Sequence, residues 1–197
     1  MYKIQYGGKK GKAINLVESP DLVAIRTKKG NDLETMNLSA RSRGMMQAVE
    51  QVGEFPEAGV TVVKMKADTT KMAVEMRDAT RAALKEEEGV KFAGRVLQDE
   101  KSGAFMLYTE NFFVKFKDDV PEAKCLELIN KYNLTIKNQV VFAKNSYFVK
   151  ADEGTGLKVF DIAQALLAEP ETENCHPEVV QQRRFKAAPN INPLQWH

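Results

Sequence analysis

Residues 111–133 contain the clearest change of periodicity in the sequence, and they read NFFVKFKDDVPEAKCLELINKYN. The run 111–116 is aromatic and β-branched enough to predict a β-strand. A helix is predicted next, because apolar side chains recur at helical spacing at Cys125, Leu128, Ile129 and Tyr132. Pro121 suits the first turn of a helix, where its missing N–H is not needed, and Asn133 can end the helix in a left-handed conformation. The stretch therefore predicts a strand that leads directly into an amphipathic helix.

The remainder of the second half continues this alternation. Two β-prone runs at 134–142 and 147–151 flank a tight turn at 144–145, which is typical of a hairpin. Residues 157–168 predict a further amphipathic helix, and a last strand is expected at 173–176.

The first half has a similar order. Strands are predicted at 22–27, 60–65, 90–97 and 104–108. Helices are predicted at 39–52 and 70–85, where Ser39 and either Thr69 or Thr70 can serve as N-caps.

Each half therefore reads as β-α-β-β-α-β, or close to it, an order that suits two helices covering one face of an antiparallel sheet. The predicted fold class is α+β, with two tandem ferredoxin-like (βαββαβ) sandwiches with antiparallel sheets and an extended C-terminal tail. The predicted domains are a first unit at 1–106, a second unit at 107–178 and the tail at 179–197. We expect the tail to be mobile unless something binds it, since it has several prolines and no helical stripe.

The composition is that of a soluble globular protein, with 43% hydrophobic and 28% charged residues among 197. The formal net charge of +2 argues against a dedicated nucleic-acid-binding protein, which normally carries a strong basic footprint. No apolar leader and no run of 18 apolar residues is visible, so neither a signal peptide nor a membrane span is expected. A cytoplasmic location is the default expectation, and secretion stays open if a leader has been trimmed.

Cys125 and Cys175 are too few for a disulfide framework, and no metal-ligand spacing surrounds them. We expect both thiols to be reduced core residues, and a single bridge within the second half remains an alternative. No cofactor and no metal site is expected, and no EF-hand-like loop is present.

No catalytic residue is expected in this chain. The two histidines are His176 and His197. His176 adjoins Cys175, but adjacent residues on a strand point to opposite faces, so the two cannot form a nucleophile–base pair. A structural histidine before a proline is the preferred interpretation.

An ordered series of segments resembles the N-terminal pro-region of bacterial, largely cyanobacterial, subtilisin-like serine proteases. The series consists of residues 90–97, 107–116, 145–151, 154–157, 175–179 (CHPEV), 183–184 (RR) and 193–197 (PLQWH). The resemblance is good over about 90–197 and weak in the first half. The family's catalytic residues cannot be carried over, because the chain has no Gly-Thr-Ser, Asp-Thr-Gly or His-Gly-Thr motif.

The resemblance implies a pro-region that acts as an intramolecular chaperone and as a cleft-blocking inhibitor of a subtilisin-like catalytic domain, in cis or in trans. The full-length precursor would be a serine endopeptidase. Such pro-regions pack a ferredoxin-like sheet on two surface helices of the protease and lay their tail in the substrate cleft. For this tail the predicted cleft-binding residues are Arg183, Arg184, Phe185, Lys186, Ala187 and Ala188. The processing site and the protease specificity are not evident from the sequence.

Three other functions stay open. A freestanding, propeptide-like protease inhibitor would share the mechanism without the covalent connection. A tandem ferredoxin-like module that binds a regulatory ligand is compatible with the fold, although fold does not imply function. An RNA-recognition module is suggested by Phe112, Phe113 and Phe116 on one strand, but its Gly-aromatic signature is absent, and alternating strand aromatics are more often core.

Overall fold

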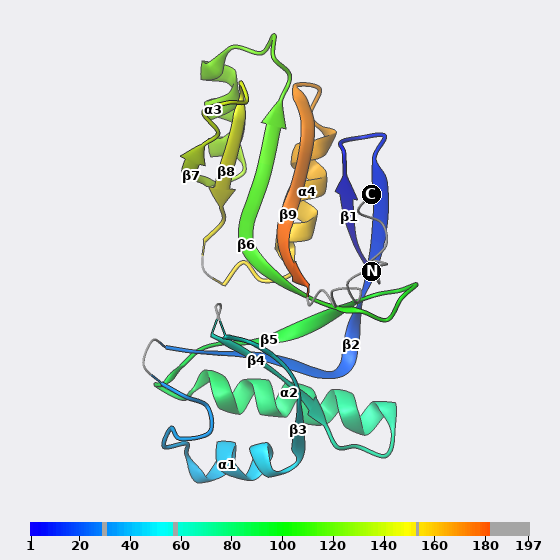
Figure 1. Cartoon of the computed structure of the whole chain (residues 1–197), viewed down its shortest axis with the longest axis vertical. Coiled ribbons are helices and arrows are strands. Elements are labelled where there is room, and N and C mark those ends of the chain that lie inside the picture. Colours follow the sequence, from blue (N-terminus) through cyan, green and yellow to red (C-terminus); the bar gives the residue numbers. More distant parts are fainter. Residues whose placement is uncertain (29–30, 57–58, 153, 182–197) are drawn as a thin grey trace, which may run out of the picture.

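The computed structural model describes residues 1–28, 31–56, 59–152 and 154–181. Its elements in chain order are β1 (Tyr2–Tyr6), β2 (Lys12–Thr27), α1 (Ala40–Gln47), β3 (Val49–Phe55), β4 (Val60–Met65), α2 (Thr70–Lys85), β5 (Val90–Asp99), β6 (Phe105–Phe116), α3 (Glu122–Lys131), β7 (Thr135–Gln139), β8 (Ser146–Lys150), α4 (Lys158–Ala168) and β9 (Thr172–Gln181). Figure 1 shows two lobes, one built from α1, α2 and β3 to β5, and the other from α3, α4, β1 and β6 to β9. Strand β2 runs through both lobes.

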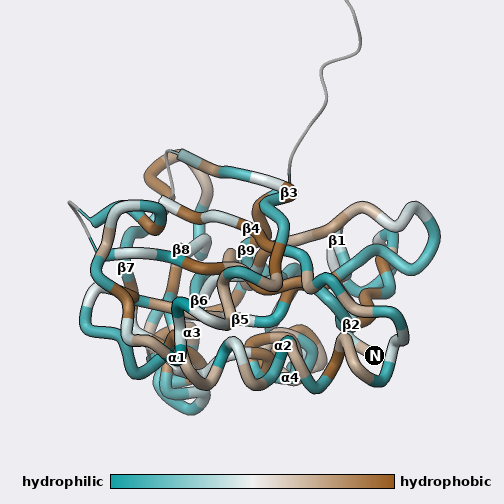
Figure 2. Tube along the Cα trace, turned by 90° about the horizontal axis from the view of Figure 1, so that it is seen from below, coloured by the Kyte–Doolittle hydropathy of each residue, from teal (hydrophilic) through white to brown (hydrophobic). Residues whose placement is uncertain are grey.

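The strands of the two lobes form one continuous antiparallel sheet, in the order β3-β4-β2-β5-β6-β8-β7, with β1 added to β2 and β9 added to β6. The predicted α+β class with antiparallel strands is confirmed. The sheet does not separate between the lobes, because β5 pairs with the start of β6 through Leu97 opposite Met106 and Gln98 opposite Phe105. Figure 2 shows that all four helices lie on the same side of the strands.

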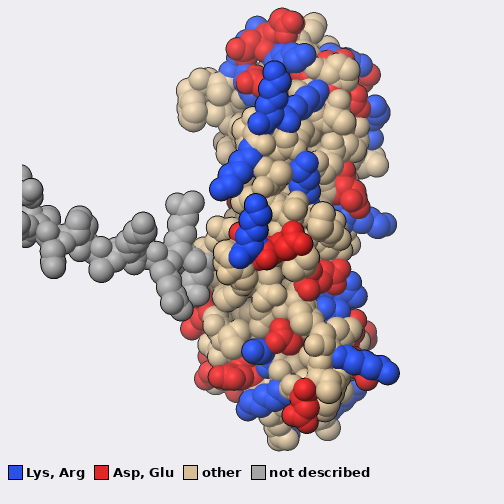
Figure 3. All heavy atoms as spheres, turned by 90° about the vertical axis from the view of Figure 1, so that its right-hand side faces the viewer, with Lys and Arg blue, Asp and Glu red and all other residues tan. Residues whose placement is uncertain are grey.

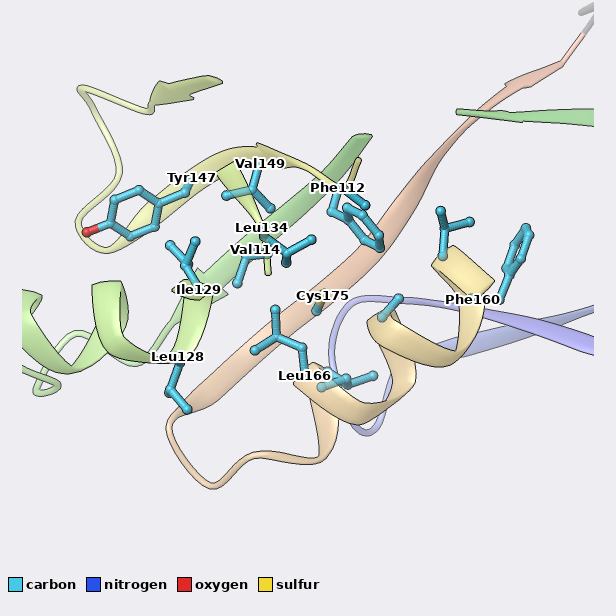
Figure 4. Packing of buried hydrophobic residues seen from close by; sticks show 14 of the residues in the cluster. Phe112, Val114, Leu128, Ile129, Leu134, Tyr147, Val149, Phe160, Leu166 and Cys175 are labelled. Atoms are coloured by element: carbon cyan, nitrogen blue, oxygen red, sulfur yellow. The ribbon is translucent and has the colours of Figure 1, made fainter. Parts of the chain in front are cut away.

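The larger core belongs to the lobe of α3 and α4. Figure 4 shows side chains from β6, β8 and β9 pointing towards those from the two helices. Phe112, Val114 and Phe116 on β6 are fully buried there, and Cys125 and Cys175 lie in the same cluster. Both cysteines are buried, so their predicted place in the core is confirmed, and both are free thiols in this structure.

The other lobe has a core on each face of its sheet. Val23, Ile25 and Leu84 belong to the cluster beneath α1 and α2. On the opposite face, Leu22, Ala24, Val62, Val96 and Leu107 form a smaller cluster that residues of β6 and β9 help to cover. This second cluster joins the two lobes by apolar contact.

A polar network also joins the lobes where β2 passes from one to the other. The buried Arg77 donates from Nη1 to the carbonyl oxygen of Ser19 at 2.7 Å. Glu18 accepts a hydrogen bond from the Tyr2 hydroxyl at 2.8 Å and pairs with Arg95 at 2.9 Å. Because these residues come from β1, β2, α2 and β5, the network fixes the N-terminal hairpin relative to the helical layer of the other lobe.

Several local sequence signals are confirmed. The hydroxyl oxygens of Ser39 and Thr69 accept hydrogen bonds from the first-turn amides of α1 and α2. Asn133 follows α3 with φ 53°, and Asn145 occupies the turn between β7 and β8 with φ 54°. Asparagine tolerates this left-handed region better than most residues do.

The predicted helix at 39–52 is wrong in its second half. Helix α1 ends at Gln47, and Val49 and Val52 lie in the edge strand β3, which pairs with β4. Their spacing fits a helix, but β-branched residues also favour strands, and pairing with β4 decides between the two.

Three other boundaries differ from the expected ones. The hairpin of β1 and β2 was not predicted before residue 22; Gly7 and Gly8, both with positive φ, make its turn. The runs expected at 104–108 and 111–116 are one strand, β6. The last strand extends to Gln181 rather than His176, because its end pairs with Met106, Leu107 and Tyr108. Among the described residues, no helix is long and apolar enough to cross a membrane.

Candidate docking surface

The sheet face opposite α3 and α4 carries a row of aromatic side chains. Since side chains alternate along a strand, the burial of Phe112 and Val114 against the helices directs Phe113 to the opposite face. The antiparallel registers place Phe113 directly opposite Phe148 of β8 and His176 of β9. Three adjacent strands therefore present one ring each at the same level of the sheet.

The four rings of this row are in contact. The Phe113 ring centroid lies 5.6 Å from that of Phe148 and 5.7 Å from that of His176. The Tyr6 ring of β1, which also packs against the core of this lobe, lies 4.8 Å from that of His176 at the end of the row. Phe148 is 45% exposed. We call these four residues, Tyr6, Phe113, Phe148 and His176, the aromatic row. Rings that lie partly open on a flat sheet are typical of interaction surfaces.

Polar side chains surround the aromatic row. Lys115 forms an ion pair with Asp118 and donates to the carbonyl of Lys144 at 2.7 Å. At another point of the rim, the Glu178 carboxylate accepts hydrogen bonds from Thr109 Oγ1 at 2.8 Å and Asn111 Nδ2 at 2.6 Å. An apolar centre with a hydrogen-bonded polar rim is the usual anatomy of a protein interface.

The loop between β7 and β8 adds an exposed apolar tip next to the sheet. Val141 and Phe142 are 99% and 95% exposed. Together with Phe148 they account for three of the eight large hydrophobic side chains that are exposed in the described part of the chain. The β7–β8 hairpin is therefore the part of this lobe where apolar surface is most available to a partner.

Burial in the aromatic row lowers the pKa of His176 from its ordinary value, and the nearby carbonyl of Pro177, 3.3 Å from Nδ1, partly opposes this shift. The folded state thus favours the neutral imidazole. The contribution of the neutral His176 to the stability of the fold is fully present above the unfolded-state pKa of about 6.5. This contribution is lost as the pH falls through the lowered folded-state pKa.

We accordingly expect the thermal stability of a His176→Gln variant to depend less on acidification than that of the native chain. The measurement is the thermal midpoint of both proteins between about pH 7.5 and about pH 5. The thermal midpoint should fall further with acidification in the native chain than in the variant. An equal fall in both proteins would show that His176 protonates as easily in the folded state as in the unfolded one.

The structure separates the three phenylalanines that suggested RNA binding. Phe112 and Phe116 are fully buried, and Phe113 alone faces outward. Figure 3 shows both acidic and basic side chains on the side of the molecule where β1 and β2 lie. The burial of two of the three phenylalanines does not favour a nucleic-acid interface.

The predicted cleft-binding residues Arg183, Arg184, Phe185, Lys186, Ala187 and Ala188 all lie outside the described residues.

Sequence reasoning missed Tyr6 and Phe148 as surface residues. Their only signal was the alternation of the strands, which shows that a side chain faces outward but not which strand lies beside it.

Burial raises the pKa of both Cys125 and Cys175, which favours the protonated thiol, a poor nucleophile. In the part of the chain that the structure describes, no group of three or more His, Cys, Asp or Glu side chains could hold a metal ion.

Two curated proteins are similar to the whole chain. Both are named calcium-dependent protease, one from Trichormus variabilis and one from a Nostoc species, and each is 38% identical over 203 aligned residues. The alignment covers all of this chain and 30% of each relative, so the chain spans less than a third of the proteins it matches. No family model matches the sequence.

Among solved structures, the small subunit of acetolactate synthase from Thermotoga maritima is similar over 84% of this chain and 98% of its own. Its sequence identity is 13% and its TM-score 0.28, a likeness too low to support an argument about fold or function.

Proposed function

We propose that this chain is the pro-region of a subtilisin-like serine protease and is itself without catalytic residues. It would bind the catalytic part of the precursor, assist its folding and block its substrate cleft. The observation that carries the proposal is the alignment, in which the whole chain matches 30% of proteins named as proteases. More than two thirds of each relative is left for the catalytic part.

We further propose that each lobe contains a ferredoxin-like unit and that the two units divide near residues 106–107, with β1 and the start of β2 added to the second lobe. The strand orders support this division, since β5-β2-β4-β3 in one lobe and β9-β6-β8-β7 in the other repeat the same antiparallel arrangement relative to the chain. In both, a strand-helix-strand segment is split by a strand inserted between its two strands. The second unit would be the docking unit, because the tail follows its last strand.

The aromatic row is the surface through which we propose that the second unit docks. Aromatic anchors that lose their hydration contribute most of the energy in protein interfaces. His176 lies on β9, and the same strand continues to Gln181, after which the tail begins. A partner bound to the row would thus be close to the point from which the tail enters a neighbouring cleft, where an extended peptide can add main-chain hydrogen bonds.

Calcium appears in the names of the relatives. The resemblance to subtilisin-like proteases supports the proposal that calcium binds to the catalytic part of the precursor.

Introduction of two positive charges into the aromatic row tests the proposal. The double variant Phe113→Arg/Phe148→Arg should bind the catalytic part of the Nostoc protease about thirtyfold more weakly than the native chain, the loss of about 2 kcal/mol expected of an interface anchor. Calorimetric titration would measure the two affinities.

The matched control is Met72→Arg/Leu126→Arg, which places two arginines at exposed apolar positions on α2 and α3. Its affinity should equal that of the native chain. Equal weakening by both variants would mean that the aromatic row is not the docking surface.

A further inference from the structure

A second feature lies between the lobes and has no part in the proposed docking surface. It is a cavity of about 520 Å³ formed where α2, β5 and β6 meet, with the loop that precedes α4 and the end of β9. We propose that this cavity binds a small organic anion with an apolar body. The proposal does not depend on the protease function.

The size and the walls of the cavity suit an apolar ligand body. Small-molecule sites typically enclose about 300–1,000 Å³ and are mostly apolar with a few polar groups. Leu107 and Val180 contribute apolar surface from the cluster that joins the lobes. Phe92 and Tyr108 stand edge to face with centroids 6.4 Å apart and supply an aromatic wall.

Gly94 allows Phe92 to hold this position. A Cβ atom on residue 94 would lie 2.1 Å from the Phe92 ring, so the ring occupies space that any other residue would fill. In this aromatic wall, the Phe92 ring therefore packs closely against the backbone of its own strand at Gly94.

The charged residues of the cavity are mostly basic. Among the described lining residues, Arg26, Arg81, Lys85 and Lys91 are basic and Glu110 is acidic. A predominance of basic side chains around an apolar space attracts anions.

Arg81 gives an anion in the cavity a specific point of contact. Its side chain is only 18% exposed, and its Nη1 lies 3.3 Å from Asp78 Oδ1. Arg81 lines the cavity, and the exposed part of its guanidinium can donate a charge-assisted hydrogen bond to a carboxylate, sulfonate or phosphate oxygen.

Two other occupants fit less well. The chain's own tail carries Arg183, Arg184 and Lys186, and its charge has the same sign as that of the cavity. A nucleic acid would require a basic surface continuing beyond the cavity, and the formal net charge of the chain is only +2. A small anion matches both the sign of the charge and the volume.

The test uses the intact chain and the fluorescent probe 8-anilinonaphthalene-1-sulfonate, with N-phenyl-1-naphthylamine as its uncharged analogue. The variant Arg26→Gln/Lys85→Gln removes two exposed cations from the rim of the cavity. Lys12→Gln/Lys71→Gln removes two exposed cations elsewhere and leaves the net charge equally lowered. Because the aromatic row could also take up the probe, the comparison between the two variants identifies the site.

We expect saturable binding of the anionic probe to the native chain, about tenfold weaker binding to the cavity variant and unchanged binding to the control. The uncharged analogue should not distinguish the three proteins. The proposal is overturned if the anionic probe does not saturate, if both variants bind it equally, or if the analogue shows the same tenfold difference.

Discussion

Removal of residues 182–197 is expected to weaken inhibition of the catalytic part by about a hundredfold, the order of the gain when a second binding segment is tethered to the first. In the proposed function the folded unit holds the tail beside the cleft, so tail binding becomes an intramolecular step. The inhibition constant for hydrolysis of a chromogenic peptide measures the loss. The described fold should not change, since β9 ends at Gln181.

The isolated peptide 182–197 is the natural control for this truncation. It should inhibit far more weakly than the intact chain, because it lacks the docking surface that raises its effective concentration. If the truncated chain inhibits as well as the intact one, the cleft is not blocked by the tail, and Arg183 to Ala188 are not the cleft-binding residues.

The second large effect concerns the core of the docking unit. Phe112→Ala should lower the free energy of unfolding by about 4 kcal/mol, because truncation of a buried phenylalanine removes its apolar contacts and leaves a cavity. Phe112 is fully buried between β6 and the helical layer, as Figure 4 shows. Urea denaturation followed by circular dichroism would measure this loss.

Phe113→Ala is the matched control, since it removes the same side chain from the neighbouring residue on the opposite face. Its cost should be clearly smaller, as Phe113 is only partly buried. Equal costs for the two variants would contradict the assignment of one residue to the core and the other to the docking surface.

The second half of the fold could be predicted closely because its local signals agree with one another. Helix α3 is amphipathic and ends before Asn133, whose positive φ fits its position. Helix α4 begins and ends within a residue of the predicted range and buries the expected side chains, Val159, Phe160, Ala163, Leu166 and Leu167. Here propensity, period and capping favour the same structure, and tertiary contacts only reinforce it.

The parts that were missed depend on pairing between distant segments. Val49 and Val52 have helical spacing, and only the neighbouring strand β4 makes their segment a strand. The long strand β2 changes partners along its length. Its start pairs with β1 and its end pairs with β4, so no single alternation of apolar and polar residues runs through it. The junction of β5 and β6, which makes the sheet continuous, involves two residue pairs and leaves no periodic signal.

The candidate site was predictable only in part for the same reason. The sequence shows that Phe113 differs in orientation from Phe112, but the register that brings Phe148 and His176 beside it comes from the folded sheet. The cavity between the lobes could not be predicted at all, since Arg81, Phe92 and Tyr108 belong to different elements and have no common motif.

The pro-region function is tested most directly by mixing the intact chain with the catalytic part of the Nostoc protease and following peptide hydrolysis and refolding together. A pro-region should inhibit the enzyme stoichiometrically and raise the yield of active protease when the denatured catalytic part refolds with the chain present. If the chain neither inhibits the enzyme nor raises that yield, it is not a pro-region of this protease class.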